Sequence, residues 1–310
     1  MDKKFDLESN IPAQGDVNGN NNMLQQEENA IEQNYNTTEN DAVVINDNSP
    51  VIILFGAGSS GKTMTLIRLS KYLMDIGFRI EPVRTFRDSR DTHYQAMCDN
   101  FTSLINSGKA PGRNLVIDYM LVKVINPSGR PVCQLLEAPG EHYFDTKNPT
   151  KDSFPTYLQT IKEHNSRKTW MFIIEKDWIP EVKAEQYNDQ QIRALYAKKI
   201  KELQDNYVLI EDGDKVIFTL HKADKHLISG QLNVKQLFAD VKNQYPSIFD
   251  NYKEKRPIIK WFKEYIFDFV PFSAGSFPDD GNGGQHYIKG KDKYPAELWQ
   301  AILKTVRGGW

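Results

Sequence analysis

The chain has few cysteines, no long apolar run and no excess of charge of either sign. Its 310 residues include only 2 cysteines, Cys98 and Cys133, too few for a disulfide framework or a cysteine-based metal site. No stretch reaches the ~18 uncharged apolar residues that a membrane helix needs, and the N-terminus lacks the apolar core of a secretory signal. These absences predict two reduced thiols, no transmembrane segment and a cytoplasmic location.

The balance of charges limits the classes of partner. Lys plus Arg total 39 against 41 for Asp plus Glu, which gives a formal net charge of -2. Such a chain has no broad electrostatic attraction for nucleic acid, so general nucleic-acid binding is not expected. A hydrophobic fraction of 39% is enough for one large or two small cores, so the sequence predicts a globular protein.

The first part of the chain differs in composition from the rest. Residues 1–50 are rich in Asn, Gln, Asp and Glu and have hardly any apolar run that could offset the cost of ordering the backbone. We expect these residues to form a disordered polar tail. From Val51 onward, short apolar runs alternate with helical stripes, which predicts a domain over residues 51–310.

Predicted strands and helices alternate within that domain. Val51–Phe55 is an unbroken apolar run, typical of a central parallel strand buried on both faces. Further strands are predicted at residues 115–125, 132–136, 170–174, 216–220 and 267–272. A short Asn-Pro-Ser-Gly-Arg turn joins the first two of these, so they should pair as an antiparallel hairpin. The predicted fold class is α/β, with three layers and a mostly parallel sheet that has one antiparallel strand.

A glycine-rich loop follows the first predicted strand and precedes an amphipathic helical pattern. The loop is a full match to the Walker A pattern, so the domain is predicted to have a P-loop NTPase fold. Its glycines let the backbone curl, so that successive N–H groups point at phosphate oxygens. Lys62 is expected between the β and γ phosphates, and the Thr63 hydroxyl on Mg²⁺. The expected nucleotide contacts are Gly56, Gly58, Ser59, Ser60, Gly61, Lys62 and Thr63.

Three later segments each follow a predicted strand. They are Glu137-Ala138-Pro139-Gly140-Glu141-His142, His221-Lys222-Ala223-Asp224 and Ser273-Ala274-Gly275. In this order they resemble the switch II, base-recognition and Ser-Ala motifs of P-loop GTPases of the Ras-like and translation-factor class, in particular larger bacterial GTPase-like proteins. The resemblance covers roughly residues 51–310. It implies GTP or GDP as the ligand, together with Mg²⁺.

For the base, the resemblance implies four contacting residues. Asp224 would accept hydrogen bonds from the guanine N1 and N2 hydrogens, which adenine lacks, and the Lys222 stem would lie along the base. Ser273 and Ala274 would present a backbone N–H to guanine O6. His221 replaces the usual Asn of the motif, and this departure implies weaker affinity.

For the phosphates, the resemblance implies a metal pair and a group that orients water. Glu137 replaces the usual Asp and would hold Mg²⁺ together with Thr63. Glu141 stands where the class places the residue that orients the attacking water, and His142 follows it, so either is a candidate. Lys62 would neutralise charge on the transferred phosphate.

The first switch departs from the class pattern. A threonine is expected just before the strand that starts at Leu115, but the residues there are Pro111-Gly112-Arg113-Asn114, and the nearest upstream threonine, Thr102, falls in a helical pattern. Either Asn114 substitutes or this segment does not clamp the nucleotide in the usual way. Arg113 is either a built-in arginine finger or a solvated loop residue.

The sequence therefore predicts a guanine-nucleotide-binding protein that hydrolyses GTP slowly with Mg²⁺ and acts as a switch for an unidentified protein partner. Two alternatives stay open. The missing threonine and Glu137 favour a nucleotide-binding assembly module that does not hydrolyse its ligand. The cluster of Arg84, Arg87 and Arg90 suits the lid of an ATP-dependent, kinase-like enzyme, in which the match at His221 to Asp224 would be fortuitous.

Overall fold

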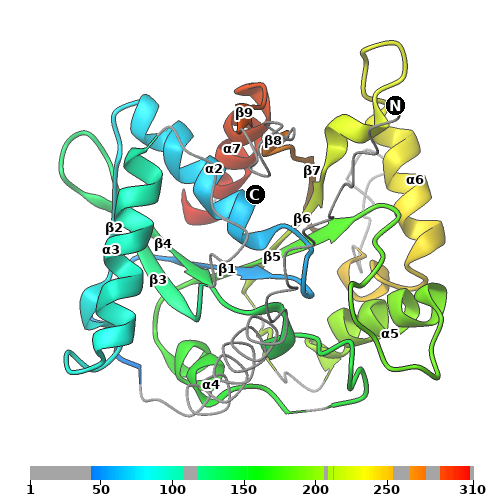
Figure 1. Cartoon of the computed structure of the whole chain (residues 1–310), viewed down its shortest axis with the longest axis horizontal. Coiled ribbons are helices and arrows are strands. Elements are labelled where there is room, and N and C mark those ends of the chain that lie inside the picture. The colour runs from blue at the N-terminus through cyan, green and yellow to red at the C-terminus, as the bar shows by residue number, and fades with distance from the viewer. Residues whose placement is uncertain are drawn as a thin grey trace, which may run out of the picture. The chain divides into compact units, whose positions relative to one another are not determined.

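A seven-stranded sheet forms the centre of the computed structural model, which describes residues 43–107, 117–151, 153–205, 209–211, 213–253, 265–276 and 287–307 (Figure 1). The strands lie in the order β2-β3-β4-β1-β5-β6-β7. In chain order they are β1 (Val51–Phe55), β2 (Arg79–Pro82), β3 (Met120–Ile125), β4 (Pro131–Glu137), β5 (Lys168–Glu175), β6 (Lys215–His221) and β7 (Asp268–Pro271). β3 is antiparallel to both neighbours and all other pairs are parallel, which confirms the prediction of one antiparallel strand.

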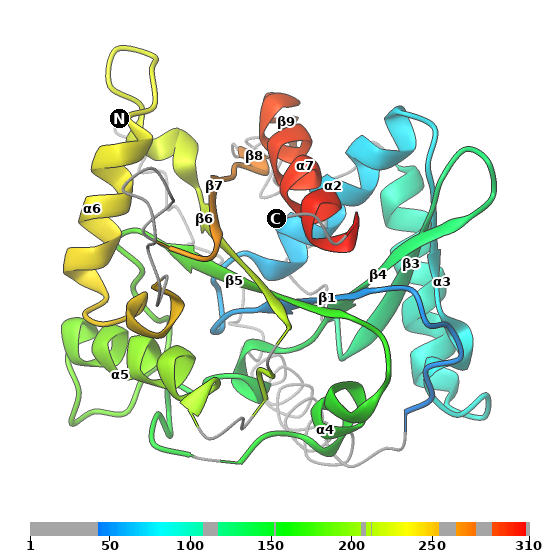
Figure 2. The same ribbon diagram turned by 180° about the vertical axis from the view of Figure 1, so that it is seen from behind.

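Helices cover both faces of this sheet. α2 (Lys62–Asp75) and α7 (Lys293–Arg307) lie on one face, and α4 (Thr156–Glu163) and α5 (Asp189–Glu202) lie on the other (Figures 1 and 2). α3 (Thr92–Asn106) packs beside α2 and β2, and α6 (Val234–Gln244) packs beside α5. The three layers agree with the predicted fold class. None of the helices in the described ranges has the length and apolar character that a bilayer crossing requires.

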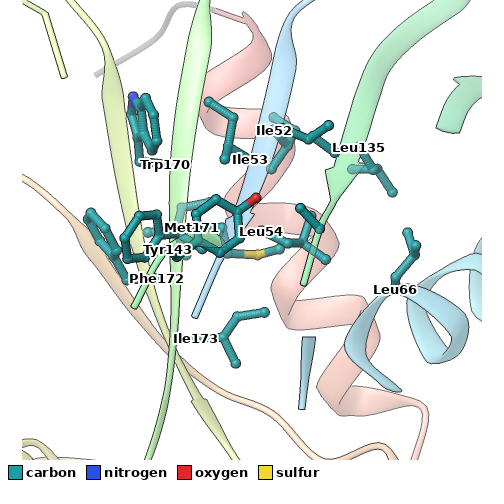
Figure 3. Packing of buried hydrophobic residues seen from close by; sticks show 14 of the residues in the cluster. Ile52, Ile53, Leu54, Leu66, Leu135, Tyr143, Trp170, Met171, Phe172 and Ile173 are labelled. Carbon is teal, nitrogen blue, oxygen red and sulfur yellow. The ribbon is translucent and has the colours of Figure 1, made fainter. Parts of the chain in front are cut away.

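The core is centred on β1, whose side chains are all buried. Figure 3 shows Ile52, Ile53 and Leu54 packed among residues of β4, β5 and α2, including Leu135, Trp170 and Leu66. The Phe55 ring lies 4.5 Å from the ring of Tyr143, which follows the predicted switch II segment. An apolar run without alternation fits this position because both faces of the strand are covered by helices. Burying a side chain such as Leu54 contributes about 1.5 to 3 kcal/mol.

Two parts of the structure extend beyond the predicted elements. β2 was not among the predicted strands, and it pairs antiparallel with β3 at the edge of the sheet. Within the segment predicted as a tail, residues 43–50 are described and contact the domain: Val43 is buried, and the Gln134 side-chain amide donates to the Asp47 carbonyl at 3.0 Å. The other residues of the predicted tail, 1–42, lie outside the described residues.

Candidate nucleotide site

The Walker A residues form the turn between β1 and α2, as the sequence predicts. α2 begins at Lys62, and its N-cap residue Gly61 has a left-handed backbone with φ 92°. A Cβ at Gly61 would collide with the His221 ring, so glycine is required there for both conformation and space. The loop thereby brings the N-terminus of α2 against the end of β6.

Lys62 is buried at the bottom of this loop. Its Nζ donates to the Ala57 carbonyl at 3.0 Å. Burial lowers the pKa of Lys62, while the charges of Glu137 and Glu141 oppose that shift. The site thus contains an ammonium group that the loop holds in place. Glu137 and Glu141 of the predicted switch II segment supply negative charge near it.

Thr63 and Glu137 meet as the sequence predicts for a metal pair. The Thr63 hydroxyl donates to Glu137 Oε1 at 2.8 Å. Glu137 is 2% exposed, and no group in the described chain hydrogen-bonds its Oε2. Burial raises the pKa of Glu137 to about 7, against the opposing effects of Lys62 and the Thr63 hydrogen bond. A buried carboxylate oxygen without a partner, beside a hydroxyl, fits a hard cation such as Mg²⁺.

Such a cation would need further oxygens from a ligand. Within the described ranges, no three His, Cys, Asp or Glu side chains come together to hold a metal ion. Mg²⁺ usually binds through one or two protein oxygens plus substrate phosphates and water. The residues present therefore fit a metal that binds together with a nucleotide.

The residues predicted as switch II lie against the phosphate loop. Gly140 lies so close to the backbone of Ala57 and Gly58 that a Cβ there would collide with it, and a Cβ at Gly58 would lie 2.8 Å from Glu141 Oε1. The Glu141 carboxylate therefore lies beside the phosphate loop. Of the two candidates for orienting water, this is the one that the structure brings to the loop.

His142 points into an aromatic cluster instead. Its ring is buried, and Nδ1 lies 3.1 Å from the Tyr157 hydroxyl. The Tyr157 ring stacks on that of Tyr119 at 4.3 Å between centroids. Burial, together with the charges of Lys151 and Lys62, lowers the pKa of His142 to about 4. Its imidazole packs in the core of the domain, and it does not line the cavity described below.

At the end of β6, the residues predicted to recognise the base turn away from the strand. Lys222 has a left-handed backbone with φ 56°, and its Nζ donates to Glu175 Oε2 at 2.6 Å. The Ala223 amide donates to the Phe272 carbonyl at 3.0 Å. This hydrogen bond joins the segment to the loop that follows β7, so the two predicted base contacts are neighbours.

A cavity of about 540 Å³ connects these segments. Seven of the predicted contact residues line it: Ser59, Gly61, Lys62, Thr63, Lys222, Asp224 and Ala274. Gly56, Gly58, Ser60 and Ser273 do not line the cavity. Ser60 and Ser273 are buried, and Ser273 Oγ accepts a hydrogen bond from the Gly275 amide at 3.3 Å.

Several lining residues were not predicted. Glu181, from the loop after β5, and Lys225 add one charge of each sign, and Met64 adds an apolar surface. The His221 ring also lines the cavity, although it is 4% exposed and neither ring nitrogen has a hydrogen-bond partner in the described chain. The motif located His221, but no sequence spacing points to Glu181.

The arginines of the kinase-like alternative are occupied elsewhere. Arg87 is buried between Asp118 and Asp91, at 2.6 and 2.5 Å. Arg90 pairs with Asp88 at 2.6 Å, and Arg84 pairs with Asp99. None of the three arginines lines the cavity.

The residues proposed for the first switch are only partly described. Arg113 and Asn114 lie outside the described residues. Thr102 lies on α3, where its hydroxyl donates to the Cys98 carbonyl at 2.8 Å. This places Thr102 in a helix, as its sequence pattern predicts.

Comparisons with known proteins add only distant likenesses. No family model and no curated protein matches the chain. Among solved structures, it is similar to a Plasmodium falciparum protein assigned as nucleolar GTP-binding protein 1, at 15% identity and a TM-score of 0.35, over 86% of this chain and 89% of that one. It is also similar to translation elongation factor SelB from Methanococcus maripaludis in complex with the GTP analogue GppNHp, at 12% identity and a TM-score of 0.35, over 85% of this chain but 35% of that one. A variant of SsGBP matches at 14% identity and a TM-score of 0.32, over 91% of this chain and 61% of that one.

Proposed function

We propose that the chain binds a guanine nucleotide with Mg²⁺ in the 540 Å³ cavity, hydrolyses GTP slowly and acts as a switch for a protein partner in the cytoplasm. The observation that carries the proposal is the composition of the cavity wall. Lys62 and Thr63 of the phosphate loop line the same space as Asp224 and Ala274 of the two base-recognition segments. A nucleotide needs phosphate-binding and base-binding groups in one pocket, and this cavity supplies both.

The base-binding groups favour guanine over adenine. The Asp224 carboxylate lines the cavity and can accept hydrogen bonds from the N1 and N2 hydrogens of guanine. Adenine has no hydrogen at N1 and no amino group at C2. An acceptor that the bound base covers and leaves unpaired costs about 1 to 3 kcal/mol, which corresponds to a selectivity of roughly 5- to 150-fold.

The phosphate end has groups that suit hydrolysis. The loop amides and the Lys62 ammonium would bind the phosphate oxygens, and Thr63 and Glu137 would hold Mg²⁺. When bound, Mg²⁺ would neutralise charge on the β and γ phosphates. The Glu141 carboxylate, beside Gly58, can accept a hydrogen bond from a water molecule and orient it. Its negative charge would also repel the γ phosphate, which supports slow hydrolysis.

A nucleotide-binding module without hydrolysis is the second candidate. The burial of His142 against Tyr157 favours it, because it leaves Glu141 as the one candidate beside the loop for orienting water. In this alternative the nucleotide would stabilise the domain and support assembly with a partner. Binding measurements alone do not separate it from a GTPase switch.

The test is a titration of nucleotide-stripped protein with fluorescent GDP and ADP analogues, with and without Mg²⁺. We expect the chain to bind GDP about tenfold more tightly than ADP or better, and Mg²⁺ to strengthen binding. Lys62→Met should weaken the binding of both GDP and ADP. Equal affinity for GDP and ADP in the wild-type protein would refute guanine recognition and support an ATP-dependent function.

Asp224→Asn sharpens this test because it exchanges an acceptor for a donor. The variant should lose its preference for GDP and gain affinity for xanthosine diphosphate, whose C2 oxygen can accept a hydrogen bond from the new amide. Asp250→Asn, at an exposed carboxylate of the η5 turn (Asp250–Tyr252), is the matched control and should bind as the wild type does. Single-turnover hydrolysis of bound GTP then separates the switch from the binding module.

A further inference from the structure

A short strand pair contributes to the base-binding wall of the cavity, which Ala274, Gly275 and Ser276 line. β8 (Gly275–Ser276) pairs antiparallel with β9 (Ile288–Lys289). The Tyr287 hydroxyl donates to the Ala274 carbonyl at 2.7 Å. Gly275 has φ 119° and lies so close to the backbone of Ile288 and Gly290 that a Cβ there would collide with it. Residues 287–290 therefore determine where Ala274 and Gly275 stand.

Arg68 of α2 in turn anchors this supporting segment. Its Nη2 donates to the Gly290 carbonyl at 3.1 Å and to Asp292 Oδ1 at 2.5 Å. The Arg68 side chain is 0% exposed, whereas that of Asp292 is 59% exposed. Within the described residues, Nε and Nη1 of Arg68 have no hydrogen-bond partner. Burying the guanidinium costs desolvation energy, and the exposed Asp292 offsets only part of it, so the pair contributes more to geometry than to stability.

The same helix carries the phosphate loop at its N-terminus. Lys62 and Thr63 lie in the first turn of α2, and Arg68 lies further along it. An α-helix is a rigid spacer with a fixed rise per residue, so it fixes the distance between the phosphate loop and the Arg68 anchor. Figures 1 and 2 both show β8, β9 and α7 beside α2.

We infer that Arg68 is a positioning residue for base recognition. It fixes the distance of Ala274 and Gly275 from the phosphate loop, so that they lie where the base binds. Arg68 does not line the cavity, so it acts through Gly290, Gly275 and Tyr287 and does not touch the nucleotide. The inference rests on the proposed guanine-nucleotide site and adds to it a determinant of selectivity outside the sequence motifs.

Arg68→Met tests this role. It replaces the buried cation with an apolar side chain of similar length, and because the Asp292 side chain is 59% exposed, the change leaves no buried charge without its partner. We expect the dissociation constant for GDP to rise about tenfold, because the loop amide no longer meets guanine O6. The wild-type preference for GDP over 6-thio-GDP, whose sulfur is the weaker acceptor, should disappear. The affinity for pyrophosphate, which needs only the phosphate loop, should not change.

Two further variants complete the experiment. Tyr287→Phe removes the hydroxyl that holds the Ala274 carbonyl and should give a smaller change in the same direction. Arg79→Met makes the same exchange at an arginine whose side chain is 64% exposed on β2, and it should bind as the wild type does.

The outcomes separate this inference from the proposed function. Wild-type GDP affinity and 6-thio-GDP preference in both Arg68→Met and Tyr287→Phe would overturn the role of Arg68. If Arg68→Met does not fold, a wild-type preference for GDP over 6-thio-GDP in Tyr287→Phe is by itself enough to overturn the role of Arg68. A wild-type protein without preference for GDP over ADP would instead refute the guanine site itself.

Discussion

His221 shows how much a single residue depends on its surroundings. Its ring packs against Gly61, stacks on Phe272 at 5.9 Å between centroids and lines the cavity. Burial lowers the pKa of His221 to about 3, and the charges of Lys222 and Lys225 act in the same direction. The imidazole is therefore neutral at neutral pH, with one nitrogen that can donate and one that can accept.

This burial predicts an acid-sensitive stability. An unfolded histidine titrates near 6.5, so between that pH and about 3 the unfolded chain binds more protons at this position, and stability falls as the pH falls. Between pH 7 and pH 5 the loss from His221 should be about 2 kcal/mol. Urea unfolding at both pH values measures it. The His221→Asn variant should lose about 2 kcal/mol less free energy of unfolding between these pH values than the wild type does. Equal losses in the variant and the wild type would contradict this account.

At the scale of elements, the start of α5 provides a test of local stability. The Asn188 side-chain oxygen accepts a hydrogen bond from the Gln191 backbone N–H, and the Gln191 side-chain oxygen accepts one from the Asn188 backbone N–H, each at 2.9 Å. Asn188→Ala removes one half of this capping box and should cost about 1 kcal/mol in chemical denaturation. No α5 residue lines the cavity, so GDP affinity should stay at its wild-type value. Asn233→Ala, at the start of α6, removes a single side-chain hydrogen bond to the Gln236 backbone N–H and provides the comparison.

The sequence predicts the central elements better than the edge of the sheet. The run at Val51–Phe55 is recognisable because both of its faces are buried, so no polar residue interrupts it. β2 has no such signal: only Ile80 is buried, and charged residues flank it. The long strand predicted at 115–125 begins at Met120 in the structure, and residues 115 and 116 lie outside the described residues.

For the candidate site, the sequence predicts the residues that belong to motifs and misses those that tertiary structure delivers. Lys62, Asp224 and Ala274 are far apart in the chain, but the carboxyl ends of parallel strands meet at one edge of a sheet, so their convergence is expected. Glu181 comes from a loop without a recognisable pattern. Arg68 lies in a helical stripe with apolar neighbours, and only the fold shows that it meets Gly290.

At the scale of the whole molecule, the seven strands differ in how they can meet solvent. β1 has parallel partners on both sides, β4 and β5, whereas β2 and β7 stand at the two edges of the sheet. Amides in the middle of a sheet exchange their hydrogens through global unfolding, and amides at an edge exchange through smaller local openings. Hydrogen exchange measured by mass spectrometry should therefore find β1 the most protected strand. Equal protection of β2 and β1 would contradict this order.

The candidate nucleotide site joins the two extremes of that order. The phosphate loop continues directly from β1, and the segment that contains Ala274 continues from the edge strand β7. A nucleotide bound to both would connect the slowest-exchanging strand to one of the fastest. Its binding should then slow amide exchange in β7 far more than in β1. The exchange rate of this edge strand would therefore report whether the site is occupied.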